Sequence, residues 1–168
     1  MFESFIETLF RLLLIIGLPA LFIIFVFRGA LIGKPIPATV ILPGYILAIS
    51  ASSIETAGII LTTAIGSTLG QLFVYGSARQ QGVSFIGAAP RVEVSAAKLQ
   101  RVEALFERYG GVGIFVTNLV PYLRGFILIP AGIAEYPISR VIAYTFVSTV
   151  LYHTMVVIVV VGIVRVLF

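Results

Sequence analysis

Long uncharged stretches, separated by short polar segments, dominate the pattern of hydrophobic and polar positions along this chain. Five can be counted: residues 12–27, 35–54, 56–78, 109–134 (interrupted only by Arg124) and 141–164. A helix needs about 20 apolar residues to cross the hydrocarbon layer of a bilayer, and these stretches are near that length. The pattern therefore predicts an all-α integral membrane protein.

Prolines and glycines interrupt two of the stretches where a spanning helix would be continuous. Residues 35–54 contain Pro35, Pro37, Pro43 and Gly44, and residues 109–134 contain Pro121, Gly125 and Pro130. Proline removes a backbone donor and glycine loosens a helix, and broken backbone at membrane depth is tolerated only where protein buries it or where it lines a wet cavity. We therefore expect three spanning helices plus two re-entrant helical hairpins. A kinked helix that spans fully is the alternative for each hairpin.

Basic residues test this topology, because they gather on the cytoplasmic side of membrane proteins. With both hairpins re-entrant, the chain crosses the membrane three times and most basic residues fall on the side of the N-terminus. That side holds Arg11, Arg79, Arg91, Lys98, Arg101, Arg108 and Arg140, whereas the other side holds Arg28, Lys34 and Arg165. This asymmetry predicts a cytoplasmic N-terminus, and we expect a prokaryotic plasma membrane as the location.

The two broken stretches suggest an internal repeat within one transmembrane domain that covers residues 1–168. Each is followed by a loop with one acid, Glu55 or Glu135, and then by a long apolar helix with polar residues near its middle. We place repeat 1 at about 30–78 and repeat 2 at about 109–164, in the inverted arrangement of many transporters. The connector, residues 79–108, has a helical period and is expected either to lie at the membrane interface or to form a solvated helix with ion pairs.

Composition narrows the chemistry that this chain can perform. Hydrophobic residues make up 60% of it and charged residues 11%, against about 25% charged in soluble domains. It has no cysteine and one histidine, so thiolate metal sites are excluded and no metal or other cofactor is expected. The net charge of +4 is spread singly beside apolar segments, which favours lipid headgroups over nucleic acid as partners. No nucleophile with a base is apparent, so we do not expect an enzyme.

Arg124 is the strongest single candidate for a binding residue. An arginine costs about 2.5 kcal/mol or more at the centre of a spanning helix, so it needs a partner or water. Its guanidinium can hold a phosphate or carboxylate bidentately, and the neighbouring Gly125 lets backbone approach closely. Asn118 lies six residues earlier and could donate to the same anion or cap the broken helix. Backbone carbonyls or the membrane interface could hold Arg124 instead.

Other polar residues in the apolar stretches have simpler explanations. Gly66 and Gly70 form a GxxxG pattern, which is typical of close helix packing. Gln71 and Tyr75 follow it, one turn apart. His153 could relay protons, but a neutral histidine that a neighbour satisfies is the simpler interpretation.

Three segments resemble the DedA family, whose members carry the SNARE-associated Golgi or VTT domain. GSTLGQLFVYGSARQQG (residues 66–82) is similar to its pattern of GxxxG, an acid, Tyr, Arg and a closing Gly. FERYGGVGIFVTNLVPYLRGFILIPAG (residues 106–132) is similar to its block FxxxG, RFxPxxR and PAG. PIPATVILPG (residues 35–44) resembles its first hairpin, usually PxPxE. The resemblance covers roughly residues 28–155 and implies two facing re-entrant hairpins and movement of phospholipids or polyprenyl phosphate carriers between leaflets, proton-coupled in some bacterial members.

The departures from this family pattern concern charge. Thr39 stands where the hairpin acid is usual, Gln71 replaces the acid of the glycine block, and Asn118 replaces the first arginine of the pair. Arg28 occupies a place where an acid is common. Because these positions lack carboxylates, we do not expect them to support the proton coupling that the resemblance implies for some bacterial members.

We therefore expect a flippase or scramblase that moves an anionic phospholipid or a polyprenyl phosphate carrier without such coupling. The alternative is a membrane-organising protein with a degenerate site. Its partners would be membrane lipid headgroups, with or without a second copy in a homodimer. The residues expected to contact the substrate are Thr39, Pro43, Gly44, Gln71, Tyr75, Asn118, Pro121, Arg124 and Gly125.

Overall fold

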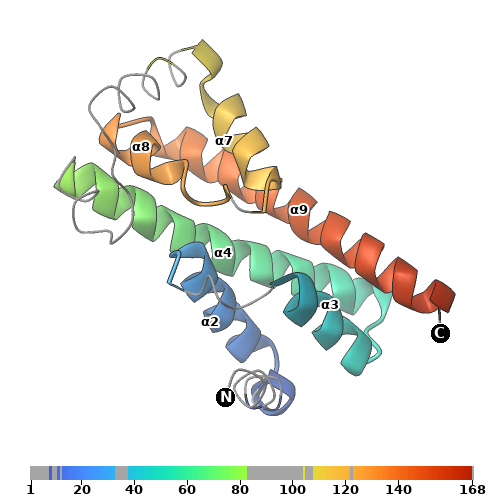
Figure 1. Cartoon of the computed structure of the whole chain (residues 1–168). Coiled ribbons are helices and arrows are strands. Elements are labelled where there is room, and N and C mark those ends of the chain that lie inside the picture. Colours follow the sequence, from blue (N-terminus) through green and yellow to red (C-terminus); the bar gives the residue numbers. More distant parts are fainter. Residues whose placement is uncertain are drawn as a thin grey trace.

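The computed structural model describes residues 8, 11, 13–32, 38–82, 104, 108–121 and 123–167, and within these ranges every regular element is a helix (Figure 1). In chain order the helices are α2 (Leu18–Gly29), α3 (Ala38–Ala48), α4 (Ser53–Gln81), α7 (Gly111–Leu119), α8 (Leu128–Ile133) and α9 (Ile138–Leu167). The all-α class expected from the sequence is confirmed for this part of the chain.

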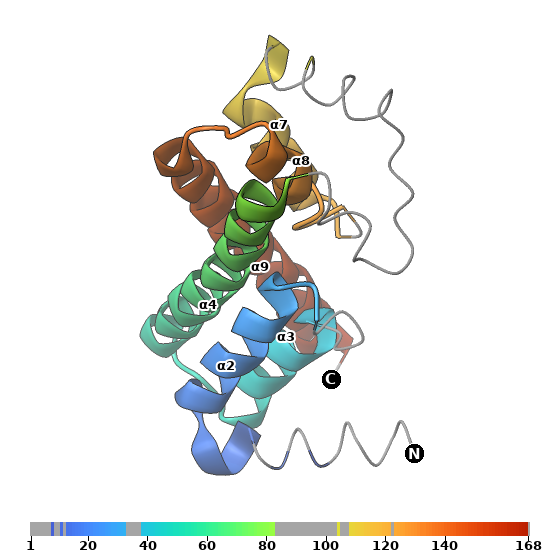
Figure 2. The same ribbon diagram turned by 90° about the vertical axis from the view of Figure 1, so that its left-hand side faces the viewer.

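The two long helices α4 and α9 form the frame of the molecule. They contain 29 and 30 residues, which corresponds to about 44 Å each at 1.5 Å per residue, and both are apolar enough to cross a membrane. They pack against each other and run in opposite directions, crossing in an X (Figure 2). A capping box at the start of α4, in which Ser52 and Glu55 exchange backbone and side-chain hydrogen bonds, fixes where that helix begins.

The shorter helices make corresponding contacts in the two halves of the chain. α2 packs on α4 as α7 packs on α9. α3 crosses over to pack on α9, and α8 crosses over to pack on α4. Each half, α2 to α4 or α7 to α9, therefore has one helix beside its own long helix and one beside the long helix of the other half.

The turn that enters the long helix has the same hydrogen bonds in both halves. Ser50 and Glu135 are left-handed, with φ of 51° and 50°. The residue after each donates its N–H to the carbonyl five residues earlier, Ala51 to Ile46 and Tyr136 to Ala131. This is the bond of a Schellman motif, which ends a helix where the chain reverses. The local geometry agrees with two related halves that run in opposite directions.

The structure differs from the sequence expectation in the first half. α3 continues through Pro43, so the break expected at Pro43 and Gly44 does not occur in this helix, since membrane helices accept a proline whose freed carbonyl finds another partner. The stretch 12–27, expected to span, is interrupted at Gly17, which has φ of 72°. α4 and α9 are the spanning candidates in the described residues, so three spans and two re-entrant hairpins remain a prediction.

The expected repeat boundaries, about 30–78 and 109–164, remain a prediction. In the described structure the counterpart of α7 is α2, which begins at Leu18. α4 continues to Gln81, beyond the expected start of the connector at residue 79. Most of the connector, and also Lys34, Pro35 and Pro37, lie outside the described residues.

Glycines allow α2 to lie directly against α4. A Cβ atom on Gly70 would overlap the backbone of α2 at Val26 and Ala30, and one on Gly66 would lie 2.7 Å from the carbonyl oxygen of Phe22. A Cβ atom on Gly29 would in turn overlap the backbone of Ser67. The GxxxG pattern therefore serves close packing, as expected, and this packing sets the position of the end of α2.

We expect Gly70→Ala to destabilise the protein by about 1–3 kcal/mol, because the added methyl group meets backbone that cannot move aside. Gly76→Ala is the matched control, since a Cβ atom there meets nothing within 4 Å. Thermal unfolding of both variants in detergent measures the difference. Equal unfolding temperatures would show that the α2–α4 contact is looser than described.

Candidate functional site

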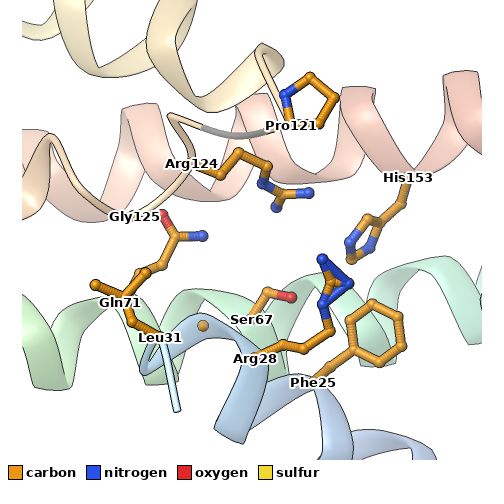
Figure 3. Close-up of a pocket in the computed structure, with 10 residues that line it drawn as sticks. Phe25, Arg28, Leu31, Ser67, Gln71, Pro121, Arg124, Gly125 and His153 are labelled. Atoms are coloured by element: carbon orange, nitrogen blue, oxygen red, sulfur yellow. The ribbon is translucent and has the colours of Figure 1, made fainter. Parts of the chain in front are cut away.

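A partly open cavity lies where the end of α2, the α7–α8 turn and the two long helices meet (Figure 3). Its volume is about 50 Å³, several times what one water molecule needs. Its lining comes from four places in the chain: Phe25, Arg28, Gly29 and Leu31, then Ser67 and Gln71, then Pro121, Arg124 and Gly125, and finally His153. Both halves of the chain therefore contribute to one small site.

Polar side chains at four-residue spacing run along both long helices toward this cavity. On α4 they are Thr63, Ser67 and Gln71, and on α9 they are Thr145, Thr149 and His153, all of them buried. Residues four apart lie on one face of a helix. Each apolar helix thus turns a polar face inward, and Ser67, Gln71 and His153 reach the cavity itself.

Arg124 enters the cavity from the α7–α8 turn. Its Nη2 donates a hydrogen bond to Thr149 Oγ1 at 3.1 Å, and its guanidinium lies over the ring of Tyr152, 4.3 Å from the ring centre. Behind it, Asn118 Oδ1 accepts a hydrogen bond from the Gly125 N–H at 3.3 Å. α9 therefore orients the guanidinium, and the Asn118 amide holds the turn that carries it.

Arg28 enters the same cavity from the last turn of α2 and points toward the space between Arg124 and His153 (Figure 3). Its Nη1 atom is buried and has no hydrogen-bond partner, and its guanidinium lies 6.0 Å from the ring centre of Phe25. The cavity thus contains two guanidinium groups, one from each half of the chain.

No carboxylate among the described residues balances these two charges. Glu55 and Glu135 are the acids in that part of the chain. Glu55 caps the start of α4, and Glu135 forms an ion pair with Arg79 at 3.4 Å. A charged group taken out of water without a partner is strongly unfavourable. The arrangement is therefore suited to an anion that enters from outside the protein.

Neutral polar atoms complete the lining. Gln71 Oε1 and His153 Nε2 are buried without a hydrogen-bond partner in the described structure. The amide NH₂ of Gln71 and the hydroxyl of Ser67 can donate to an oxyanion that the two arginines hold. No group of three or more metal-ligating side chains occurs in the described ranges.

The residues expected from the sequence fall into three places. Gln71, Pro121, Arg124 and Gly125 line the cavity together, and Asn118 lies just behind them. Tyr75 is buried outside the lining, where its hydroxyl donates to the Tyr136 carbonyl and accepts from Arg79 Nη1 at 3.4 Å. Thr39, Pro43 and Gly44 lie on α3, also outside the lining.

Sequence reasoning did not assign three polar residues of the cavity lining, Arg28, Ser67 and His153, as contacts of a ligand. Arg28 was interpreted as an orientation signal because it follows an apolar stretch. Its departure from the family pattern, in which an acid is common at this place, was the available signal. Ser67 was hidden inside the GxxxG pattern, one face of which packs while the other lines the cavity.

Replacing one of the two arginines should stabilise the empty protein. We expect Arg28→Met to increase the unfolding free energy in neutral detergent by about 1 kcal/mol or more, because it removes a buried charge that has no counterion and faces a like charge. Arg140→Met, at an exposed position, is the control and should change little. Destabilisation by Arg28→Met would instead mean that the protein itself compensates the charge.

Comparison with known proteins places the chain in a family. The VTT domain profile matches residues 8–164. Undecaprenyl phosphate transporter A of Bacillus subtilis (strain 168) is 30% identical over 113 residues, which cover 66% of this chain and 56% of the relative. The Uncharacterized membrane protein YkoX of the same organism is 29% identical over 114 residues, which cover 67% of this chain and 52% of that relative.

The alignments thus span about half the length of these curated relatives, and no solved structure matches the chain. Apolar helices long enough to cross a bilayer and a membrane family together identify an integral membrane protein. The match over residues 8–164 confirms the resemblance found in the motifs: the chain belongs to the VTT domain, or DedA, family.

Proposed function

We propose that this protein moves an anionic lipid, a phospholipid or a polyprenyl phosphate carrier, between the two leaflets of its membrane. The observation that carries the proposal is the pair of half-buried guanidinium groups, Arg28 and Arg124, in one cavity to which no described residue contributes a carboxylate. A relative that covers two thirds of this chain at 30% identity is named as an undecaprenyl phosphate transporter, which supports a phosphate-bearing lipid.

The cavity fits a headgroup rather than a whole lipid. About 50 Å³ holds a phosphate and a few of its neighbouring atoms, whereas acyl or prenyl chains need far more space. The chains would therefore remain in the bilayer while the phosphate passes through the protein. Arginine suits this role because its planar fork of donors matches phosphate oxygens.

The arrangement of the helices supports passage from one side to the other. The short helix pairs, α2 with α3 and α7 with α8, would enter the membrane from opposite sides as re-entrant hairpins, and the end of α2 and the α7–α8 turn both line the cavity. In inverted-repeat transporters the substrate site lies where the two repeats meet, near the middle of the bilayer. Opening of one half and then the other would expose Arg28 and Arg124 to the two sides in turn.

The energy for movement would come from the lipid gradient. Thr39, Gln71 and Asn118 are neutral at positions where the family pattern has charged residues, and the described residues supply no acid to the cavity. Proton coupling through carboxylates therefore has no chemical basis at these positions. We therefore expect the lipid to move down its own concentration gradient, as in a scramblase or in a flippase without coupling.

A reconstituted vesicle assay tests the proposal. We expect the wild type to move a fluorescent phospholipid with an anionic headgroup between leaflets, and Arg124→Ala and Arg28→Ala each to lower the rate at least tenfold, because each removes charge-assisted hydrogen bonds to the headgroup. Arg140→Ala, an exposed arginine at the start of α9, is the matched control and should retain the rate.

Equal rates in the wild type and in both cavity variants would contradict the site assignment. A wild type that moves no lipid, in vesicles where its folding is verified, would favour the alternative of a membrane-organising protein. Arg124→Lys separates charge from geometry, because a lysine retains the charge but loses the bidentate fork and should recover only part of the rate.

A further inference from the structure

His153 is the one histidine of the chain and lines the cavity, and its surroundings fix the direction in which it presents a lone pair. The ring is buried on α9, packs edge-on against Phe25 with ring centres 5.0 Å apart, and points toward the cavity (Figure 3). Its Nδ1 lies 3.0 Å from Thr63 Oγ1 on α4. Its Nε2 has no partner among the described residues.

The Thr63 hydroxyl determines which nitrogen of His153 carries the proton. Thr63 Oγ1 lies 2.9 Å from the Ile59 carbonyl oxygen and 3.0 Å from the Ile60 carbonyl oxygen. Carbonyl oxygens only accept, so the single hydroxyl proton goes to them, as is usual for threonine inside a helix. Oγ1 must then accept from His153, which places the ring proton on Nδ1 and leaves Nε2 with a free lone pair toward the cavity.

The charged groups around His153 keep this lone pair free in the empty site. Arg124 comes from the α7–α8 turn, Arg28 from α2, and Tyr152 precedes the histidine on α9. α4 presents the neutral Thr63, and the titratable residue of α3, which packs on α9, is Tyr45. A third positive charge beside two guanidinium groups is disfavoured, so the ring stays neutral until an anion enters.

The cavity therefore combines several donors with two acceptors that have no partner in the described structure, Gln71 Oε1 and His153 Nε2. A glutamine amide can turn its NH₂ to a ligand instead, whereas the imidazole with its proton on Nδ1 cannot. Arg28, Arg124 and Gln71 can donate hydrogen bonds to oxygens of an anion, whereas His153 Nε2 can only accept. A phosphate diester has no O–H group to offer to Nε2, and two lone pairs facing each other repel. A phosphate monoester that retains one proton has both the negative charge that the two arginines bind and the O–H donor that Nε2 lacks.

We propose that His153, with Thr63 behind it, makes the site selective for phosphate monoesters over phosphate diesters. This inference rests on the proposed function and specifies its substrate class. In the complex one proton lies between Nε2 and a phosphate oxygen. Below the second pKa of the monoester, near 6, the monoester itself brings this proton. Above that pH the complex takes the proton up from water. His153 acts as a specificity-determining residue and the two arginines as the anion anchors.

Two lipids that differ by one methyl group test this selectivity. Dioleoyl phosphatidic acid is a monoester, and dioleoyl phosphatidylmethanol is the corresponding diester. Binding of each to the full chain in neutral detergent is measured by calorimetry, in two buffers with different ionisation heats so that proton uptake is counted. We expect the wild type to bind the monoester about tenfold more tightly, the effect of one hydrogen bond to a charged group, and to take up as much as one proton at pH 8.

Two variants separate the histidine from the fold. His153→Leu should lose the proton uptake and most of the preference for the monoester, because it removes the acceptor Nε2 and keeps both arginines. Thr63→Val, which has nearly the same shape but no hydroxyl, frees the ring to place its proton on Nε2 and should reduce the preference at least threefold. Selectivity that survives in both variants would overturn the inference.

The same experiment distinguishes this inference from the proposed function. If the wild type binds both lipids equally and Arg124→Ala binds neither, the proposed selectivity is wrong but the anion site is supported. A wild type that binds neither would overturn both.

Soluble anions identify the source of the ligand. Inorganic phosphate and sulfate are added as competitors, because at neutral pH phosphate has an O–H group and sulfate has none. Displacement of phosphatidic acid by neither anion supports a lipid ligand, and displacement by phosphate alone supports the same chemistry in a free ion. Equal displacement by both anions would contradict the role of the acceptor.

Discussion

Arg28 and Arg124 bring two like charges, each half-buried, into one cavity, and the rest of the structure is arranged around that constraint. A single charge in a membrane-spanning helix costs about 2.5–3.5 kcal/mol, and repulsion adds to the cost when a second charge lies beside it. The described residues offset it only partly, with the hydroxyl of Thr149 and the ring face of Tyr152 for Arg124 and that of Phe25 for Arg28. An arrangement this unfavourable when empty is typical of a binding site, where a ligand supplies the missing charge.

Close packing is what brings the two charges together. Arg28 is followed by Gly29, whose missing side chain lets α2 touch α4 at Ser67, next to the cavity. On the opposite side, Gly132 brings α8 against α4 at Tyr75, and the α7–α8 turn that carries Arg124 precedes α8. The glycines that appeared structural in the sequence thus also set the geometry of the site.

Part of this arrangement could be predicted from the sequence, and the limits have physical reasons. The apolar lengths of α4 and α9 and the cost of an arginine in an apolar run were enough to identify the frame and Arg124. Arg28 was not identified, because an arginine at the end of an apolar stretch can point to lipid headgroups or into the protein with the same local sequence. The continuity of α3 through Pro43 was likewise not predicted, because a proline in an apolar stretch can either end a helix or only kink it.

The central claim is that both arginines contact the same phosphate, and solid-state NMR in bilayers measures this directly. The protein carries ¹³C at the guanidinium carbons of arginine, and ¹³C–³¹P dipolar recoupling to a bound phosphate lipid gives the distance, with Arg28→Lys and Arg124→Lys to assign the signals. The account predicts a phosphorus within about 5 Å of both Arg28 and Arg124, and of neither in the presence of a lipid that lacks phosphate. Dephasing confined to interfacial arginines such as Arg140, with none at the two cavity residues, would contradict it.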